Sequence, residues 1–230
     1  MSESTGIARP EVEFKFIPHK RKSIKSRAYF DKDNLQFEQA SKLDKTIGIY
    51  LAANQIENPN VLSERFSNLE VNKAENDIIQ ILKIIEPDLR KLIVRFGGGI
   101  PIIYGDIGMN KIIPLPLMGD GMGRLLRIAL AITDAAKGIV LIDEIENGLH
   151  YTVMKNVWKA IAQLAKECST QIFATTHSRE CIQAAHEAFT EEKTYDFLLH
   201  RLDRIKGKIS DVVYDKETLE AALKAKFEIR

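Results

Sequence analysis

The sequence of 230 residues contains no segment of the form G-x-x-x-x-G-K-[ST], the glycine-rich loop that commonly holds nucleotide phosphates. Its two cysteines, Cys168 and Cys181, form neither a C-x-x-C pair nor a zinc-ligand spacing, which predicts reduced thiols. No apolar run approaches the roughly 20 residues of a membrane span, and the first residues lack a signal-peptide pattern. The net charge of +1 gives no global argument for a nucleic-acid partner. These absences together predict a soluble, cytoplasmic protein that does not associate with membranes.

The composition is that of an ordinary globular protein, with 45% hydrophobic residues available for a core. Strand and helix patterns alternate from residue 138 onward, which favours an α/β layer with parallel strands. The predicted fold class is therefore α/β, a mostly parallel sheet flanked by helices. We expect three parts: a β-rich segment at 1–55, a helical insertion with a β-hairpin region at 56–117, and an α/β lobe at 118–230.

Hydrophobic periodicity and turn residues predict the individual elements. Asn58-Pro59 has the residue types that begin a helix, with Asn as N-cap and Pro at the first helical position. Gly138 is expected to cap the C-terminus of the helix at Met122–Lys137. The expected strands are Val12–Ile17, Thr46–Leu51, Leu89–Phe96, Ile100–Tyr104, Lys111–Leu115, a run starting at Gly138, Gln171–Ala174, Tyr195–Leu202 and Lys208–Val213. The expected helices are Asn60–Val71, Lys73–Ile85, Met122–Lys137, Tyr151–Cys168, Ser178–Phe189 and Lys216–Lys224.

The segment Gly138–His150 carries the strongest chemical signal. Four large aliphatic residues run directly into two adjacent carboxylates, Asp143 and Glu144. Such an apolar, β-branched run suits a strand buried on both faces of a parallel sheet, and open α/β sheets bind ligands at the carboxyl ends of their strands. This is the Walker B arrangement, in which Asp143 would hold Mg²⁺ and Glu144 would act as general base on the attacking water. By itself the pair is equally compatible with two solvated acids at a strand end.

Two further motifs give this pair a context. His177 follows the next short apolar strand, where an imidazole can reach a γ-phosphate or the attacking water, although a single histidine at a strand end is more often structural. Gly119, Asp120 and Gly121 precede a helix, and free backbone amides at a helix N-terminus form an anion site. Taken alone, this loop is also compatible with a flexible entrance to the helix.

These three motifs, in this order, resemble the second half of an ABC-type ATPase nucleotide-binding domain, most closely the AAA-annotated bacterial ATPases of the OLD, RecF and SMC branch. The resemblance implies ATP and Mg²⁺ as ligands, a signature at Gly119-Asp120-Gly121, a D-loop containing Asn147 and Gly148, and a switch histidine at His177. It also places Gln55 as the Q-loop glutamine. The family fold implies a dimer with the nucleotide between one subunit's P-loop and the other's signature.

The sequence departs from this family in lacking the P-loop, and it has Gly119 where many members carry serine. Two hypotheses follow. The chain is the C-terminal portion of an ATPase whose P-loop segment is missing from it, acting as a homodimer or with a P-loop-containing partner. Alternatively, it is a catalytically degenerate subunit that lends its signature loop to a complete partner ATPase, in a nucleic-acid or phage-defence complex.

Two weaker alternatives remain open from the residues. A metal-dependent nuclease could use the same acids, but the roughly 40 residues after Phe189 are too few for the separate acidic domain that OLD-type nucleases carry. The basic cluster at Lys20, Arg21, Lys22, Lys25 and Arg27 could contact nucleic acid, as in relatives of this branch, but such runs are more often solvated loops.

Overall fold

The computed structural model describes residues 11–16, 24–31, 34–39, 46–54, 57–205 and 207–229. The chain divides into two units, Met1–Thr46 and Ile47–Arg230. The predicted Q-loop residue Gln55 and the basic residues Lys20, Arg21 and Lys22 lie outside the described residues.

The first unit is an antiparallel three-stranded sheet in the order β1 (Glu11–Phe16), β2 (Ile24–Asp31) and β3 (Asn34–Gln39). The β1–β2 register pairs Glu11 with Tyr29, and the β2–β3 register pairs Asp31 with Asn34. This sheet confirms the β-rich character predicted for the N-terminal part.

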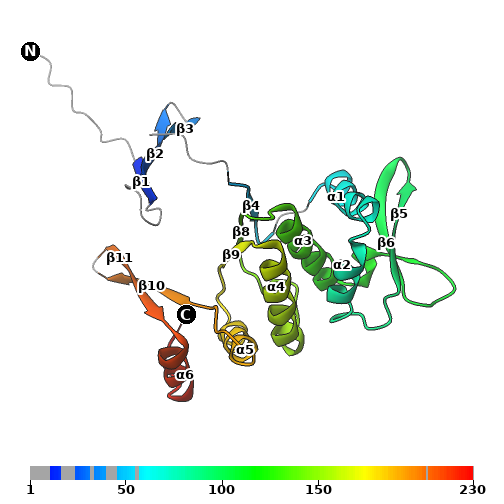
Figure 1. The fold of residues 1–230 in the computed structure, drawn as a ribbon. Helices are drawn as coiled ribbons and strands as arrows, with labels where there is room; N and C mark the ends of the chain where they lie inside the picture. The colour runs from blue at the N-terminus through cyan, green and yellow to red at the C-terminus, as the bar shows by residue number, and fades with distance from the viewer. Residues whose placement is uncertain are drawn as a thin grey trace, which may run out of the picture. The chain divides into compact units, whose positions relative to one another are not determined.

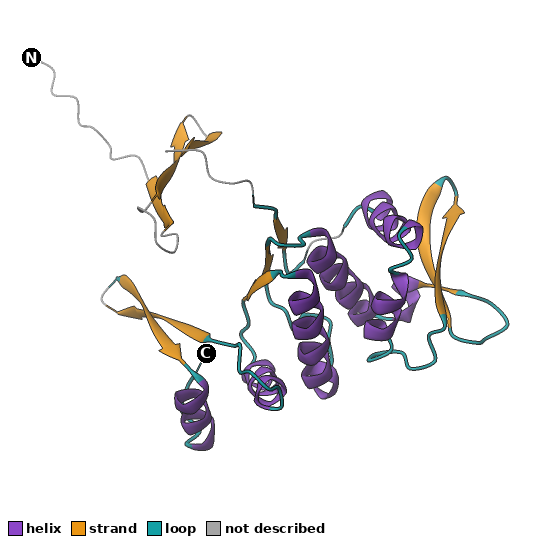
Figure 2. Ribbon diagram, in the orientation of Figure 1, coloured by secondary structure: helices purple, strands orange, loops and turns teal. Residues whose placement is uncertain are grey.

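The second unit contains a parallel sheet that determines the position of the candidate site. Its order is β4 (Gly48–Leu51), β8 (Ile139–Ile142) and β9 (Gln171–Ala174), with β8 in the middle. Both pairings are parallel, so all three strands end at the same edge. The predicted α/β class with a parallel sheet is thereby confirmed (Figures 1 and 2).

The long connection between β4 and the next helix of the parallel layer forms the predicted helical insertion. It contains α1 (Pro59–Val71), α2 (Glu75–Leu82) and an antiparallel sheet of β5 (Lys91–Gly97), β6 (Ile100–Asp106) and β7 (Ile113–Pro114). As predicted, the Asn58 side chain caps α1 by accepting the Asn60 backbone N–H over 3.0 Å. Gly98 and Gly99 both have positive φ angles at the β5–β6 turn, where other residues would be strained.

One face of the parallel sheet is covered by helices α3 (Asp120–Asp134) and α4 (Met154–Cys168), which lie on the same side of the strands in Figure 1. Short 3₁₀ turns precede each of them, at Leu115–Met118 and Tyr151–Val153, and α5 (Arg179–Thr190) packs against α4. Apolar residues of α3 and α4 form one continuous core with Val140 and Ile142 of β8. Burial of these apolar stripes is the main stabilising contribution to the layer.

Two local expectations were wrong. Gly138 does not cap α3, whose C-cap is Ala135. A Cβ atom on Gly138 would lie 2.2 Å from the carbonyl oxygen of Ile47, so glycine is required there for close approach of two backbones. Second, β8 is not buried on both faces, because Leu141 is 44% exposed between two buried neighbours.

The chain ends in an antiparallel hairpin, β10 (Leu199–Ile205) with β11 (Lys208–Tyr214), followed by α6 (Lys216–Lys224). A small apolar cluster of Ile182, Leu219, Ala222 and Ile229 joins α6 to α5. Among the described residues, none of the helices has the length and apolarity that a membrane crossing demands.

Candidate functional site

The predicted acid pair lies at the carboxyl edge of the central strand, directly after Ile142. The Thr175 hydroxyl, which follows β9, donates to Asp143 Oδ1 over 2.7 Å and accepts the backbone N–H of Glu144 over 2.9 Å. The Thr175 backbone N–H donates to the Ile142 carbonyl over 2.9 Å, and its carbonyl accepts the Ile145 N–H over 3.1 Å. Four hydrogen bonds to one residue therefore fix the two acids relative to β9.

A buried arginine supports the same turn from the other side. Arg124, in the first turns of α3, is only 2% exposed. Its guanidinium donates to the backbone carbonyls of Asp143 over 2.6 Å, Glu144 over 3.1 Å and Ala52 over 3.0 Å. Glu144 has a φ of +47°, a left-handed conformation that costs a non-glycine residue free energy. Arg124 thus joins α3, the end of β4 and a strained turn after β8.

The loop after β9 is attached to the acidic turn through Glu146. Its Oε1 accepts the backbone N–H of His177 over 3.0 Å, while its Oε2 is buried and has no hydrogen-bond partner among the described residues. The side chain of His177 is exposed. The next residue, Ser178, caps α5 by accepting the Cys181 backbone N–H over 3.1 Å. The structure therefore brings the predicted switch histidine to the same edge as the acids and holds it by its backbone.

The predicted signature and D-loop residues contact one another. A Cβ on Gly121 would lie 2.8 Å from the Gly148 carbonyl oxygen. A Cβ on Gly148 would lie 3.4 Å from the Cβ of Asp120. Both Gly119 and Gly148 have positive φ, at +101° and +76°. These glycines allow the N-terminus of α3 to pack on the loop after β8 at distances that side chains would prevent.

Asn147 connects this D-loop to the segment after β4. Its side-chain amide donates to the Ala53 carbonyl over 3.1 Å and to Asn54 Oδ1 over 3.3 Å. The chain segment in which the Q-loop glutamine was predicted therefore begins next to the acidic turn. Gln55 itself is outside the described residues, so its predicted role stays a prediction.

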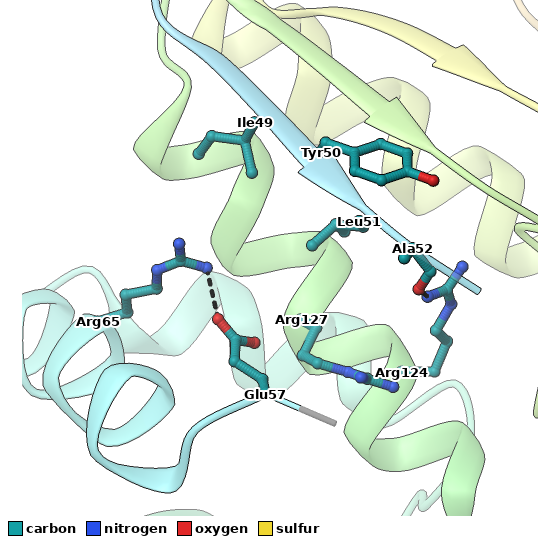
Figure 3. Close-up of a pocket in the computed structure, with 8 residues that line it drawn as sticks. All are labelled: Ile49, Tyr50, Leu51, Ala52, Glu57, Arg65, Arg124 and Arg127. Atoms are coloured by element: carbon teal, nitrogen blue, oxygen red, sulfur yellow. Dashed lines mark hydrogen bonds and ion pairs between the residues drawn. The ribbon is translucent and has the colours of Figure 1, made fainter. Parts of the chain in front are cut away.

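A pocket of about 60 Å³ lies between β4, α1 and α3 (Figure 3). Arg65 forms an ion pair with Glu57 across it at 2.8 Å, and Arg124 and Arg127 line its far side. Nucleotide-sized ligands occupy pockets of roughly 300 Å³ or more. This pocket is too small for one, so it is a packing defect beside the acidic turn and not the candidate nucleotide site.

The charges at the carboxyl edge are coupled through Arg124. Burial lowers the pKa of Arg124, nearby Arg127 lowers it further, and Asp143, Glu146 and Glu144 act in the opposite direction. The three carboxylates therefore compensate a guanidinium that has been removed from water. The pKa of Cys181 is raised to about 11, mainly by burial and to a lesser degree by the negative charge of Glu146. This thiol therefore stays protonated and unreactive at neutral pH.

The sequence predicted the acids, the histidine and the glycines as site residues but gave no role to three residues that hold them in place. Thr175 was visible as a polar residue at the end of β9, and Glu146 as a third acid close to the pair. Arg124 gave no signal beyond its place after a glycine-rich loop, because its acceptors are backbone carbonyls that no sequence pattern marks.

One sequence relative and two solved structures are similar to this chain. An "ATP/GTP phosphatase" of Helicobacter pylori (strain ATCC 700392 / 26695) is 29% identical over 171 residues, which are 71% of this chain and 44% of that protein. The chain thus spans less than half the length of this curated relative. The structure is similar to an SmcHead solved with the C-winged helix domain of ScpA, with a TM-score of 0.59, 14% identity, and coverage of 90% of this chain and 75% of that one.

A second solved structure comes from work on ATP-driven dimerization and DNA-stimulated activation of SMC ATPases. It has a TM-score of 0.50 and 17% identity, and the match covers 73% of this chain and 96% of that one. At these identities the two structures establish the fold alone, which is that of an AAA/ABC-type ATPase. A family model described as "AAA domain, putative AbiEii toxin, Type IV TA system" matches residues 11–181, well over half of the sequence. The chain therefore belongs to this family of AAA domains.

Proposed function

We propose that the carboxyl edge of the β4–β8–β9 sheet is the Mg²⁺–ATP site of an ABC-type ATPase domain. The observation that carries the proposal is the Thr175 bridge, which holds the Asp143 carboxylate and the Glu144 backbone at one edge with His177 attached beside them. An accidental pair of solvated acids would not need a dedicated hydroxyl, a buried arginine and a strained backbone to hold it in place.

The donor set fits Mg²⁺. The Asp143 carboxylate and the Thr175 hydroxyl supply hard oxygen atoms, and no group of three potential ligand side chains occurs in the described ranges. Mg²⁺ commonly binds through one or two carboxylates and keeps waters or phosphate oxygens as its other ligands. A bound Mg²⁺ would neutralise charge on the phosphates during transfer.

The chain's own residues have separate roles in this proposal. Asp143 binds the metal, Glu144 orients and deprotonates the attacking water, and His177 reaches the γ-phosphate or that water. Gly119, Asp120 and Gly121, with the helix N-terminus of α3, contact the nucleotide of a second protomer or partner, next to Asn147 and Gly148. ATP would then be bound between two protein copies, and we keep Gln55 as a further nucleotide contact.

The test uses nuclear magnetic resonance, because a chain without a phosphate loop should bind nucleotide weakly. Addition of Mg²⁺–ATP up to about 10 mM, which detects dissociation constants in the millimolar range, should shift the amide signals of Asp143, Thr175 and His177. Asp143→Asn should abolish these shifts, and the surface change Glu167→Gln should not. Unchanged amide signals at these three residues, or equal shifts with and without Mg²⁺, would refute the proposed Mg²⁺–ATP site.

A second candidate is the degenerate subunit that lends its signature loop to a complete ATPase. The exposure of Gly119 and Asp120 at the start of α3 favours it. In a complex with such a partner, Asp120→Arg should abolish turnover while Asp143→Ala leaves it nearly intact. A substitution at Gly121 is unsuitable for this comparison, because any side chain there collides with the chain's own Gly148 carbonyl.

A further inference from the structure

The pocket of about 60 Å³ between β4, α1 and α3 has a charged lining. Glu57 and Arg65 lie on the side of α1, and Arg124 and Arg127 lie on the side of α3 (Figure 3). Cavities that stay dry in proteins are lined by apolar side chains, whereas polar cavities hold molecules that form hydrogen bonds. This packing defect therefore has the lining of a site for a small polar ligand.

Two atoms of this lining, Arg124 Nε and Glu57 Oε2, are buried and have no hydrogen-bond partner among the described residues. Arg124 is 2% exposed, and its three hydrogen bonds use only the terminal nitrogens Nη1 and Nη2. The other carboxylate oxygen of Glu57, Oε1, accepts a hydrogen bond from Arg65 Nη1 over 2.8 Å. Buried polar groups without a partner are costly and rare in native proteins. One such donor and one such acceptor in the same pocket are complementary to a ligand that both accepts and donates.

The charges of the pocket favour an anion as this ligand. Three guanidinium groups line it, and the two carboxylates that balance them, those of Glu57 and Asp134, both pair with Arg65. One positive charge is left over, on the side of Arg124 and Arg127. The pKa of Arg124 is lowered mainly by burial and next by Arg127, so the two guanidinium groups repel each other. The acids of the turn oppose this shift, but they do not line the pocket. An anion between the two arginines would relieve their repulsion.

The size of the pocket limits this anion to a few atoms. A cavity needs about 10–15 Å³ for each water-sized group that it holds, so about 60 Å³ accommodates about four to six non-hydrogen atoms. Bicarbonate and hydrogen phosphate are of this size, and each carries a hydroxyl group beside its charged oxygens. The hydroxyl can donate to Glu57 Oε2, while the charged oxygens can accept from Arg124 Nε and from the guanidinium of Arg127. Nitrate and sulfate have the same shapes but no hydroxyl, so they leave Glu57 Oε2 without a donor.

We propose that the pocket between β4, α1 and α3 binds a small oxyanion that carries a hydroxyl group, of the kind represented by bicarbonate and hydrogen phosphate. Glu57 accepts from the hydroxyl, and Arg124 and Arg127 bind the charged oxygens. The bound anion joins α1 to α3 beside the guanidinium that holds the acidic turn. This site is separate from the proposed Mg²⁺–ATP site and does not depend on it.

The experiment compares two pairs of anions on the full chain at constant pH and ionic strength, with chloride as the background ion. Bicarbonate and nitrate are flat, hydrogen phosphate and sulfate are tetrahedral, and only the first of each pair has a hydroxyl. Ligands with so few atoms bind at best in the micromolar range, so each anion is added up to about 50 mM. Nuclear magnetic resonance follows the Nε–H signal of Arg124. A hydroxyl-bearing anion should shift this signal and bind at least about tenfold more tightly than its partner of the same shape.

Glu57→Gln separates the hydroxyl contact from the charge of the pocket. Arg65 would hold the amide oxygen, so the amide NH₂ group would face the pocket and donate where Glu57 Oε2 accepts. The preference for the hydroxyl-bearing anion should therefore fall at least about tenfold, to equality or to a preference for its partner. The matched control Glu64→Gln changes an exposed glutamate of α1 and should keep the native preference. Arg127→Gln should weaken all four anions together, because it removes charge and leaves the hydroxyl acceptor in place.

Three results would overturn the proposal and leave water as the occupant of the pocket. They are equal responses to both members of each pair, an Arg124 Nε–H signal that no anion shifts, and an unchanged preference in Glu57→Gln. Failure of this site can be separated from failure of the nucleotide site, because Asp143→Asn should abolish the response to Mg²⁺–ATP and keep the preference for the hydroxyl-bearing anion. If the anion binds and Mg²⁺–ATP does not, the pocket stands and the proposed function is wrong, and the opposite result reverses this conclusion.

Discussion

Replacement of Arg124 by methionine tests whether a buried guanidinium assembles the candidate site. Methionine fills the volume of the arginine stem but cannot donate to the carbonyls of Ala52, Asp143 and Glu144. Hydrogen bonds from a charged donor contribute about 1.5–3 kcal/mol each in mutational series. Burying the charged guanidinium costs desolvation free energy, as the lowered pKa of Arg124 indicates. This cost offsets part of the summed contribution of the three hydrogen bonds.

We therefore expect Arg124→Met to lower the free energy of unfolding by about 3 kcal/mol, a large part of the roughly 5–15 kcal/mol of a typical domain. Urea denaturation followed by circular dichroism measures this change. The control is Arg179→Met, since Arg179 also donates to two backbone carbonyls, at 2.9 Å and 3.4 Å, but in the C-terminal segment. It should cost about 1 kcal/mol or less.

The second measurement separates site assembly from general stability. In Arg124→Met the amide signals of Asp143 and Glu144 should move or broaden even where the protein is fully folded, and in Arg179→Met they should not. Equal destabilisation by the two substitutions, or unchanged signals at both acids in Arg124→Met, would refute the assembly role of Arg124.

Four other changes have expected outcomes. Thr175→Val, which removes the bridging hydroxyl, should cost about 1–3 kcal/mol in urea unfolding and abolish the response to Mg²⁺–ATP; Thr175→Ser should restore both, and failure of this rescue would contradict the bridge. Glu144→Gly should raise the melting temperature, because glycine relieves about 1 kcal/mol of backbone strain at the left-handed φ of this residue. Glu144→Gln keeps the strain and should leave the melting temperature unchanged. No difference between the two variants would argue against strain. Gly138→Ala places a Cβ 2.2 Å from a backbone oxygen and should lower the free energy of unfolding by about 3 kcal/mol or prevent folding. Gly123→Ala, where an added Cβ meets no atom outside α3, should raise the free energy of unfolding by about 0.5–1 kcal/mol in the same assay. Similar effects of the two substitutions would refute the packing argument. Burial lowers the pKa of His186 below 6.5, so the unfolded chain protonates first and stability should fall from about pH 6.5 down to the lowered folded-state pKa; His186→Gln should flatten this part of a melting-temperature profile, and an unchanged slope would show that His186 does not cause it.

The predicted elements agree closely with the structure where local chemistry decides them. The strand Gln171–Ala174 and the helix Lys216–Lys224 have the bounds read from the sequence, and Asn58 caps α1. These features depend on side-chain period, caps and turn residues that are present within a few positions of each other. Gly138 was misread because its requirement for glycine comes from Ile47, far away in sequence.

The candidate site was predictable in its acids and glycines and not in its supports. Acids after an apolar strand, a histidine after the next strand and glycines before a helix are patterns within single segments, so the sequence alone predicted an α/β layer with a candidate nucleotide site at its edge. Only the tertiary structure decided that Thr175 and Arg124 hold the acids, and that one apolar face of the sheet is exposed within the described residues of the second unit. Hydrogen bonds to backbone carbonyls and the coverage of a sheet face depend on which distant segments meet, and this is set by packing of the whole chain.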